Sequence, residues 1–394
     1  MQTPVIIGAL RTPIGSFHGG LKNIPAPLLA GTVAAELLRR TGVARADVDE
    51  LILGNVIGAG LGQNPARQAA ILAGIPFTAS AFTVDMVCGS GLRAVCIAAN
   101  AIALGESTVL IAGGAESMSR APHLVLRDAS SPRPVNAMRH DGLHCAFRKE
   151  PMGVFAETLA RARGVTREEQ DRYALASQQR AVEAIDRGLF APEIVPVERD
   201  GEGVCAEDEC PRRECSMEQL ALLKPAFRKD GTVTAGNATP ISDGAAAVLV
   251  VSEEYARARG IPPLARVASC CTAGVELEEA FAAPIPAVRK LLAKNRLSIG
   301  EIDLIEVGDS FAVEGVVCRR ELGWDPARVN TRGGTLALGH PLGASGARIL
   351  VTLLHALRDA RKRLGLAVIC LGGGNAVAML VENADFPAAA PRAS

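Results

Sequence analysis

Short runs of apolar residues alternate with Ala-rich segments of helical periodicity along most of the chain. In residues 28–40, Leu29, Val33 and Leu37 recur at helical spacing, which predicts a helix with one buried face. Six apolar runs predict strands: 4–11, 50–57, 107–116, 246–254, 302–310 and 366–375. Most of them are almost continuously apolar, which is typical of a sheet that helices cover on both faces. The pattern predicts an α/β fold.

Three pairs of short segments repeat in the same order along the chain. The paired segments are 48–55 with 302–309, 89–95 with 344–350, and 109–115 with 368–374. Three matches in register indicate two duplicated α/β halves. Two such halves pack with their equivalent loops facing each other. We therefore expect the loops near residues 88, 340 and 370 to meet.

The middle of the chain departs from this pattern. Residues 127–144 and 200–215 are rich in polar and loop-forming residues, and we read the first stretch as a surface excursion. Between them, 166–190 reads as a helix with Thr166 and Glu169 placed for a capping box. We predict three parts, with the inserted one acting as a cap: an N-terminal half at 1–120 completed by about 245–265, an inserted loop domain at 121–244, and a C-terminal half at 266–394.

Composition narrows the function classes. Lys+Arg and Asp+Glu are equal at 42 each, so no basic surface suggests nucleic acid. No signal peptide is apparent, and we expect no apolar run of membrane-spanning length. Ten cysteines without a secretory signal indicate reduced thiols rather than a disulfide framework. We expect a soluble, cytoplasmic protein.

Cys88 stands where the run 82–87 gives way to Gly89-Ser90-Gly91 and then to a helical segment. A thiol at a helix N-terminus feels the positive end of the helix dipole, which favours its thiolate. Free N–H groups at such a turn can bind an oxyanion. The alternative is a small buried hydrophobe in a tight corner, as we expect for Cys96 on the following helix.

Two further residues suit chemistry with Cys88. His340 is fixed between Gly339 and Pro341, as a base near a cysteine requires, although a histidine in such a turn can be an ordinary loop residue. Cys370 ends an apolar run just before three glycines. A thiol there suits proton transfer at the α-carbon of a thioester, because its ordinary pKa is about 8.5. The alternatives are a buried core cysteine or a disulfide with Cys88, which a reducing compartment disfavours.

Five longer motifs together resemble the thiolase family, the acetyl-CoA C-acyltransferases. The motifs lie at 87–95, 113–123, 223–248, 329–350 and 370–379, and the resemblance covers almost the whole chain. It implies a duplicated five-layer α/β/α/β/α fold with an inserted loop domain, assembled as a homodimer or homotetramer. It also implies acyl-CoA and CoA as substrates, no other cofactor, and a place in fatty acid or polyhydroxyalkanoate metabolism.

The resemblance also implies roles for individual residues. Cys88 would be the nucleophile, His340 its activating base and an oxyanion donor, and Cys370 the acid/base thiol. The backbone N–H groups of Cys88 and Gly372 would form an oxyanion hole. The reaction is thiolytic cleavage of a 3-oxoacyl-CoA or the reverse Claisen condensation. The CoA-binding residues would be Met152, Arg212, Leu223, Phe227, Ala235, Thr239 and Phe311.

The clearest departure from the family pattern is Gly308, where thiolases carry an Asn or a His that helps build a second oxyanion hole. Glycine has no side chain for this, so we expect a slower half-reaction or room for a different acyl group. Two alternatives follow: an acyltransferase that uses a non-CoA acceptor, or a weakly active CoA-ester-binding subunit.

Smaller departures accompany Gly308. Pro151 precedes Met152 where the short-chain branch has His, Thr239 replaces a serine, and Asp85 replaces an Asn. Cys205, Cys210 and Cys215 are evenly spaced, and His140 and His144 lie four positions apart. Metal binding is nevertheless not expected, because no CxxC pair is present.

Overall fold

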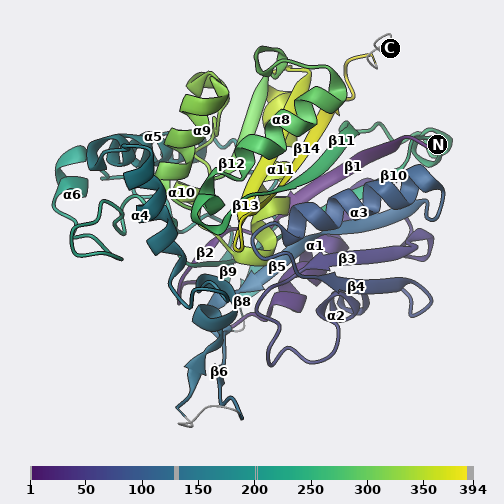
Figure 1. The fold of residues 1–394 in the computed structure, drawn as a ribbon. Coiled ribbons are helices and arrows are strands. Elements are labelled where there is room, and N and C mark those ends of the chain that lie inside the picture. The colour runs from purple at the N-terminus through teal and green to yellow at the C-terminus, as the bar shows by residue number, and fades with distance from the viewer. Residues whose placement is uncertain (1, 128–132, 200, 202, 388–394) are drawn as a thin grey trace.

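Two groups of strands lie on either side of a central helix pair in the computed structural model, which describes residues 2–127, 133–199, 201 and 203–387 (Figure 1). The first group runs in the order β4 (Ser80–Val84), β3 (Glu50–Gly54), β5 (Val109–Ser117), β10 (Ser242–Ser252) and β1 (Pro4–Arg11), with β2 (Gly15–Ser16) paired to β10. The second runs β11 (Ala265–Gly274), β14 (Asn375–Asn383), β13 (Leu364–Leu371) and β12 (Leu304–Gly308). The groups join where β1 meets β11 at Val5–Arg266 and Ile6–Ala265.

The two groups repeat one pattern of pairing. In the first, β3 is parallel to β5, and β5, β10 and β1 then pair antiparallel. In the second, β12 is parallel to β13, and β13, β14 and β11 then pair antiparallel. The segments matched in the sequence lie on equivalent elements, so the duplication inferred from them agrees with the topology.

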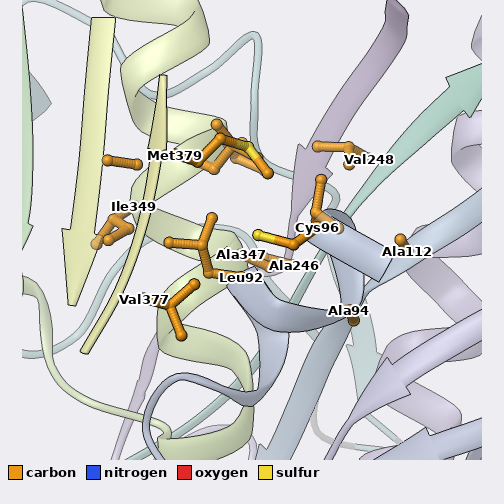
Figure 2. Close-up of a cluster of buried hydrophobic side chains, with 14 of the residues drawn as sticks. Leu92, Ala94, Cys96, Ala112, Ala246, Val248, Ala347, Ile349, Val377 and Met379 are labelled. Carbon is orange, nitrogen blue, oxygen red and sulfur yellow. The ribbon is translucent and has the colours of Figure 1, made fainter. Parts of the chain in front are cut away.

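The central helices α3 (Ser90–Leu104) and α11 (Leu342–Asp359) pack together between the two groups of strands. They begin in close contact, since a Cβ at Gly91 would lie 2.8 Å from the carbonyl oxygen of Gly343. Leu92 and Cys96 of α3 share one buried cluster with Ala347 of α11 and with strand residues (Figure 2). Cys96 is fully buried there, as expected.

Outer helices complete five α/β/α/β/α layers. Helices α1 (Ala26–Thr41) and α2 (Pro65–Leu72) form a second core with the first group of strands, while α8 (Pro284–Asn295) and α9 (Ala312–Leu322) form a third with the second group. Shorter helices are α7 (Glu253–Ala258), α10 (Thr335–Leu338), and the 3-10 helices η1 (Arg45–Asp47), η2 (Met118–Arg120), η4 (Leu277–Ala282), η5 (Ile299–Glu301) and η6 (Pro326–Arg328). The fold class agrees with the sequence expectation.

One apolar segment is longer than we expected. By length and composition, the window Val87–Leu104 would suffice to cross a membrane, so the expectation that no run reaches that length is wrong. The window contains α3, which is buried between the strands because the core of a five-layer fold is apolar on all sides. This segment is the central helix of the fold.

The insertion contains β6 (His123–Leu124), β7 (Val135–Asn136), the π-helix η3 (Met138–Leu143), α4 (Met152–Ala162), α5 (Arg167–Asp186), β8 (Val197–Arg199), β9 (Gly203–Cys205) and α6 (Met217–Ala221). The capping box of α5 is confirmed at Thr166 and Glu169. Residues 127–144 and 200–215, which we expected to be loop-like, are partly buried. Met138 packs into the central core, and Asp208 is buried in an ion pair with Arg11. Residues 128–132, 200 and 202 of these stretches lie outside the described part.

Candidate active site

Cys88 lies on a sharp turn between β4 and α3. Val87, just before it, has φ of 47°, a left-handed conformation that a β-branched residue rarely adopts. Ser90 holds the turn, since its Oγ accepts the N–H of Met86 at 2.8 Å and donates to the carbonyl of Val87 at 2.6 Å. Such strain costs about 1–3 kcal/mol and persists where the surroundings enforce it, typically at functional sites.

The thiol of Cys88 is buried and receives two backbone amides. Burial, with the charges of Glu314 and Glu116, raises its pKa to about 12, while the N–H groups of Gly372 and of Cys88 itself act in the opposite direction. The helix N-terminus led us to expect a resting thiolate, whereas burial favours the thiol. A base has to remove the proton.

Cys370 lies near the end of β13, beside Cys88. Its Sγ donates to Oε2 of Glu314 at 3.2 Å and lies 3.8 Å from Oγ of Ser310. Burial raises the pKa of Cys370 well above its ordinary value, and the charges of Glu314 and Cys88 raise it further. This thiol also rests in its protonated form.

His340 is held in one tautomer. Its Nδ1 lies 2.6 Å from Oγ of Ser345, and that hydroxyl donates its proton to the carbonyl of Pro341 at 2.9 Å. We therefore assign the hydrogen to Nδ1, which leaves a lone pair on Nε2. Nε2 is buried and has no hydrogen-bond partner among the described residues. Burial, with the charge of nearby Arg348, lowers the pKa of His340 to about 3, so the ring is neutral.

Loops from both halves bring the three residues to one region. Gly89, beside Cys88, approaches Leu371, beside Cys370, because a Cβ at Gly89 would lie 2.5 Å from Leu371 Cδ2. The segment 239–240 connects His340 to Ser310, which lies against Cys370. Thr239 donates its N–H to the carbonyl of Ser310 at 3.1 Å, and Pro240 accepts the N–H of His340 at 3.2 Å. The loops near 88, 340 and 370 meet as the repeat predicts.

Gly308 ends β12 opposite Ile369 in the parallel register. A Cβ at position 308 would lie 2.5 Å from both Cδ1 and Cγ1 of Ile369 and 2.9 Å from its Cβ. The isoleucine thus fills the space that a side chain at 308 needs. The expectation that glycine leaves room for a different acyl group is wrong at this point, because close packing of Ile369 removes the room.

Several predicted CoA-binding residues cluster beside the thiols. Met152, at the start of α4, approaches Gly372: its Sδ would lie 4.0 Å from a Cβ there. Phe311 adjoins Ser310, and its ring lies 6.0 Å from that of Phe227 in an edge-to-face arrangement. Phe311 and Cys370 share one buried apolar cluster, and Met152 and Phe227 pack against it, so these three side chains form an apolar wall near Cys370.

The other predicted CoA-binding residues lie further out. Leu223 packs against Gly236, Ala235 is exposed, and Thr239 is half-buried. Arg212 is exposed, its N–H donates to Gln178, and it lines a separate cavity of about 300 Å³ along α5. None of the three proposed catalytic residues lines this cavity, so the structure does not bring Arg212 to them.

The described part of the chain contains no group of three or more His, Cys, Asp or Glu side chains that could hold a metal ion. All ten cysteines are free thiols, Cys205 and Cys210 being buried and Cys215 half-buried.

Three residues of the site escaped the sequence reasoning. Glu314 lies in the apolar first half of α9, and an acid in such a stretch is a sequence signal of a buried functional carboxyl. Ser345 lies in a matched repeat segment, five positions beyond His340, and Ser310 follows Gly308 by two. Their roles depend on contacts that spacing alone does not give.

Comparisons with known proteins agree along nearly the entire chain. Residues 4–254 match the family model "Thiolase, N-terminal domain", and residues 261–383 match "Thiolase, C-terminal domain". The chain is 51% identical over 390 residues to an acetyl-CoA acetyltransferase of Pseudomonas aeruginosa, covering 96% of this chain and 99% of the relative. It is 46% identical over 391 residues to an acetyl-CoA acetyltransferase of Paracoccus denitrificans, covering 97% of this chain and 100% of the relative.

Two solved structures are similar in fold. The acetyl-CoA acetyltransferase of Bacillus anthracis superposes with a TM-score of 0.94 at 41% identity, covering 97% of this chain and 99% of that one. The Acat5 thiolase of Ascaris suum, solved in complex with coenzyme A, has a TM-score of 0.92 at 42% identity, covering 97% and 100%.

Proposed function

Because the chain belongs to the thiolase family and is an acyltransferase, we propose that it transfers an acetyl group through Cys88, His340 and Cys370. The family resemblance and the acyl transfer read from the sequence are confirmed. The observation that carries the assignment of residues is that two buried thiols, Cys88 and Cys370, interact with each other on loops that meet the loop of His340, whose buried Nε2 has no hydrogen-bond partner among the described residues. The relatives' names favour CoA over the non-CoA acceptor considered above.

In the first half-reaction, His340 takes the proton of Cys88 at Nε2. The thiolate attacks the thioester carbonyl of acetyl-CoA, an acetyl-enzyme forms, and CoA leaves with a proton from the imidazolium. Burial disfavours each ion alone, but the thiolate and the imidazolium form together as a pair that stabilises both.

In the second half-reaction, Cys370 removes the α-proton of a second acetyl-CoA. The resulting carbanion attacks the acetyl group on Cys88, and 3-oxoacyl-CoA is released. The N–H groups of Cys88 and Gly372 both act on the sulfur of Cys88, which supports the proposal that they bind the oxyanion at the attacked carbon. Removing one such donor typically costs about 3 kcal/mol of barrier. After it has taken a proton, Nε2 of His340 becomes a donor as well.

CoA is the second substrate of this reaction, and we assign its pantetheine to the wall formed by Met152, Phe227 and Phe311. Thr239 adjoins this wall through its backbone bond to Ser310. Leu223 and Ala235 would lie along the outward path, and Arg212 is available to the nucleotide end only if CoA extends to α5.

Steady-state thiolysis of acetoacetyl-CoA tests the proposal. The wild-type enzyme should form acetyl-CoA, whereas Cys88→Ala, His340→Ala and Cys370→Ala should each lose activity by at least about 10²-fold. A variant that retains wild-type kcat would remove that residue from the mechanism. Comparison with a longer 3-oxoacyl-CoA would report the acyl-chain preference.

We also propose a homodimer formed through the edge strand β4. No strand of the described residues pairs with its outer edge, and Phe77 beside it is 75% exposed. An exposed edge with apolar neighbours is suited to pairing with a second copy. Light scattering should give a smaller particle for Phe77→Asp than for the wild-type protein.

A homotetramer would use the hairpin of β6 and β7, which projects from the body (Figure 1). Val125 and Leu126 next to it are exposed. Val125→Asp with Leu126→Asp should then convert tetramers into dimers without loss of thiolysis. We place the protein in the cytoplasm, where its ten free thiols would stay reduced.

A further inference from the structure

A buried carboxyl group touches one of the two reacting thiols. Glu314, in the first turn of α9, accepts the S–H of Cys370 at 3.2 Å and the N–H of Ser310 at 3.0 Å, both on Oε2. Its Oε1 is buried and has no hydrogen-bond partner among the described residues. The two half-reactions described above leave this carboxyl without a role.

Glu314 lies among other acidic groups. Burial, with the charge of Asp309 after β12, raises the pKa of Glu314 well above its ordinary value. Glu314 in turn raises the pKa of Cys370 on β13, Cys318 on α9, Tyr173 on α5 and Cys88 just before α3. A carboxylate with raised proton affinity is a stronger base, so taking a proton from a thiol costs less free energy.

We propose that Glu314 is the proton partner of Cys370: it accepts the thiol proton when Cys370 acts as a base, and it returns that proton when Cys370 acts as an acid. The proposal rests on the role assigned to Cys370 above. A carboxylate and a thiol 3.2 Å apart, in a site that disfavours two anions, share their protons as one coupled pair.

The step balances as follows. The S–H bond of Cys370 breaks and an O–H bond forms on Oε2 of Glu314. The thiolate then takes the α-proton of acetyl-CoA, so that a C–H bond breaks, an S–H bond forms, and the electron pair stays on the α-carbon. Attack of this carbon on acetyl-Cys88 expels the thiolate of Cys88. That thiolate takes up the proton held by Glu314, passed on through Cys370. Glu314 is then again a carboxylate, and Cys88, Cys370 and His340 are neutral.

Glu314→Gln separates this role from a structural one. The amide has the same shape, and its oxygen, placed where Oε2 lies, can accept both the N–H of Ser310 and the S–H of Cys370. What it cannot do is take a proton at neutral pH. A purely structural Glu314 would therefore be replaced by Gln without loss, or with equal loss in both half-reactions.

Two readouts on the whole enzyme test the proposal. The first is exchange of the α-protons of acetyl-CoA with D₂O, followed by mass spectrometry, which reports Cys370. The second is the rate of Cys88 acetylation by acetyl-CoA, followed by intact mass. Glu314→Gln should slow exchange by about 10²-fold or more at neutral pH, the usual worth of a positioned base. Acetylation should be no slower than in the wild-type enzyme, because the charge of Glu314, which raises the pKa of Cys88, is then absent. Exchange in Glu314→Gln should recover as the pH rises, because Cys370 must then ionise alone.

Glu321→Gln, at a half-buried acid of the same helix that pairs with Arg163, is the matched control and should leave both rates unchanged. Exchange at the wild-type rate in Glu314→Gln, or equal loss of exchange and acetylation, would overturn the proposal. Should that variant fail to fold, Glu314→Asp decides: reduced exchange at a normal acetylation rate supports the role, and unchanged exchange contradicts it. Cys370→Ala separates the role of Glu314 from the proposed function. If α-proton exchange survives in this variant, Cys370 is not the base and the proposed function itself is contradicted.

Discussion

The imidazole of His340 and the hydroxyl of Ser345 form a hydrogen bond of 2.6 Å that fixes which ring nitrogen is free. Ser345 donates to the carbonyl of Pro341 and so can only accept from Nδ1. The lone pair on Nε2 follows from this chain of two bonds. An orienting serine five positions from the base is thus part of how the enzyme prepares proton transfer.

Ser345→Ala should lower kcat for thiolysis by about 10-fold or more. The lost bond is charge-assisted once the imidazolium forms, and such bonds contribute about 1.5–3 kcal/mol. Thermal unfolding checks that the fold survives. An unchanged kcat would show that packing alone holds the ring.

Gly308→Asn should not restore a faster reaction by itself. The new side chain would collide with Ile369, whose Cγ1 and Cδ1 lie 2.5 Å from the Cβ position, so we expect lower thermal stability and no gain in kcat. Gly308→Asn combined with Ile369→Ala makes room and should regain stability relative to Gly308→Asn. A stable, more active single variant would contradict this packing argument.

Alkylation of Cys88 by iodoacetamide should depend on His340. The pKa of Cys88 is raised to about 12, so the free thiol is the form present at neutral pH. In His340→Asn the rate should rise about tenfold per pH unit through the alkaline range, since only the thiolate reacts. The wild-type rate at pH 7 should exceed that of the variant. A plateau near pH 7 in His340→Asn would indicate a thiolate stabilised by other groups. Peptide mass spectrometry separates Cys88 from the other thiols.

Arg11 ties the insertion to β1, because it is fully buried and pairs with Glu193 at 2.5 Å and Asp208 at 2.7 Å. Arg11→Met should lower the free energy of unfolding by about 3–5 kcal/mol, as it leaves two buried carboxylates unpaired. Arg39→Met, in an exposed pair on α1, is the control and should cost about 1 kcal/mol or less. Equal effects in urea denaturation would contradict the account of this cluster.

The sequence was sufficient for the architecture because duplication left matching segments on β3 and β12, α3 and α11, and β5 and β13. The run 82–87 before Cys88 also indicated β4, which it overlaps. The sequence did not indicate β11, which carries small and polar residues in place of an apolar run. Strands of this kind are held by their neighbours rather than by their own pattern.

The motifs identified Cys88, His340 and Cys370, but they did not predict the protonation states of these residues. The helix N-terminus suggested a thiolate at Cys88, whereas burial favours the thiol. Desolvation depends on what the fold places around a group, and local sequence does not contain that information. The same holds for Glu314, whose contact with Cys370 joins residues 56 positions apart.

Intact-mass analysis of the enzyme mixed with acetyl-CoA tests the central claim most directly. We predict one added acetyl group, mapped to Cys88 by peptide mass spectrometry, lost on addition of CoA, and absent in Cys88→Ala. An acetyl group that persists in Cys88→Ala, or that maps to Cys370 in the wild-type enzyme, would contradict the account.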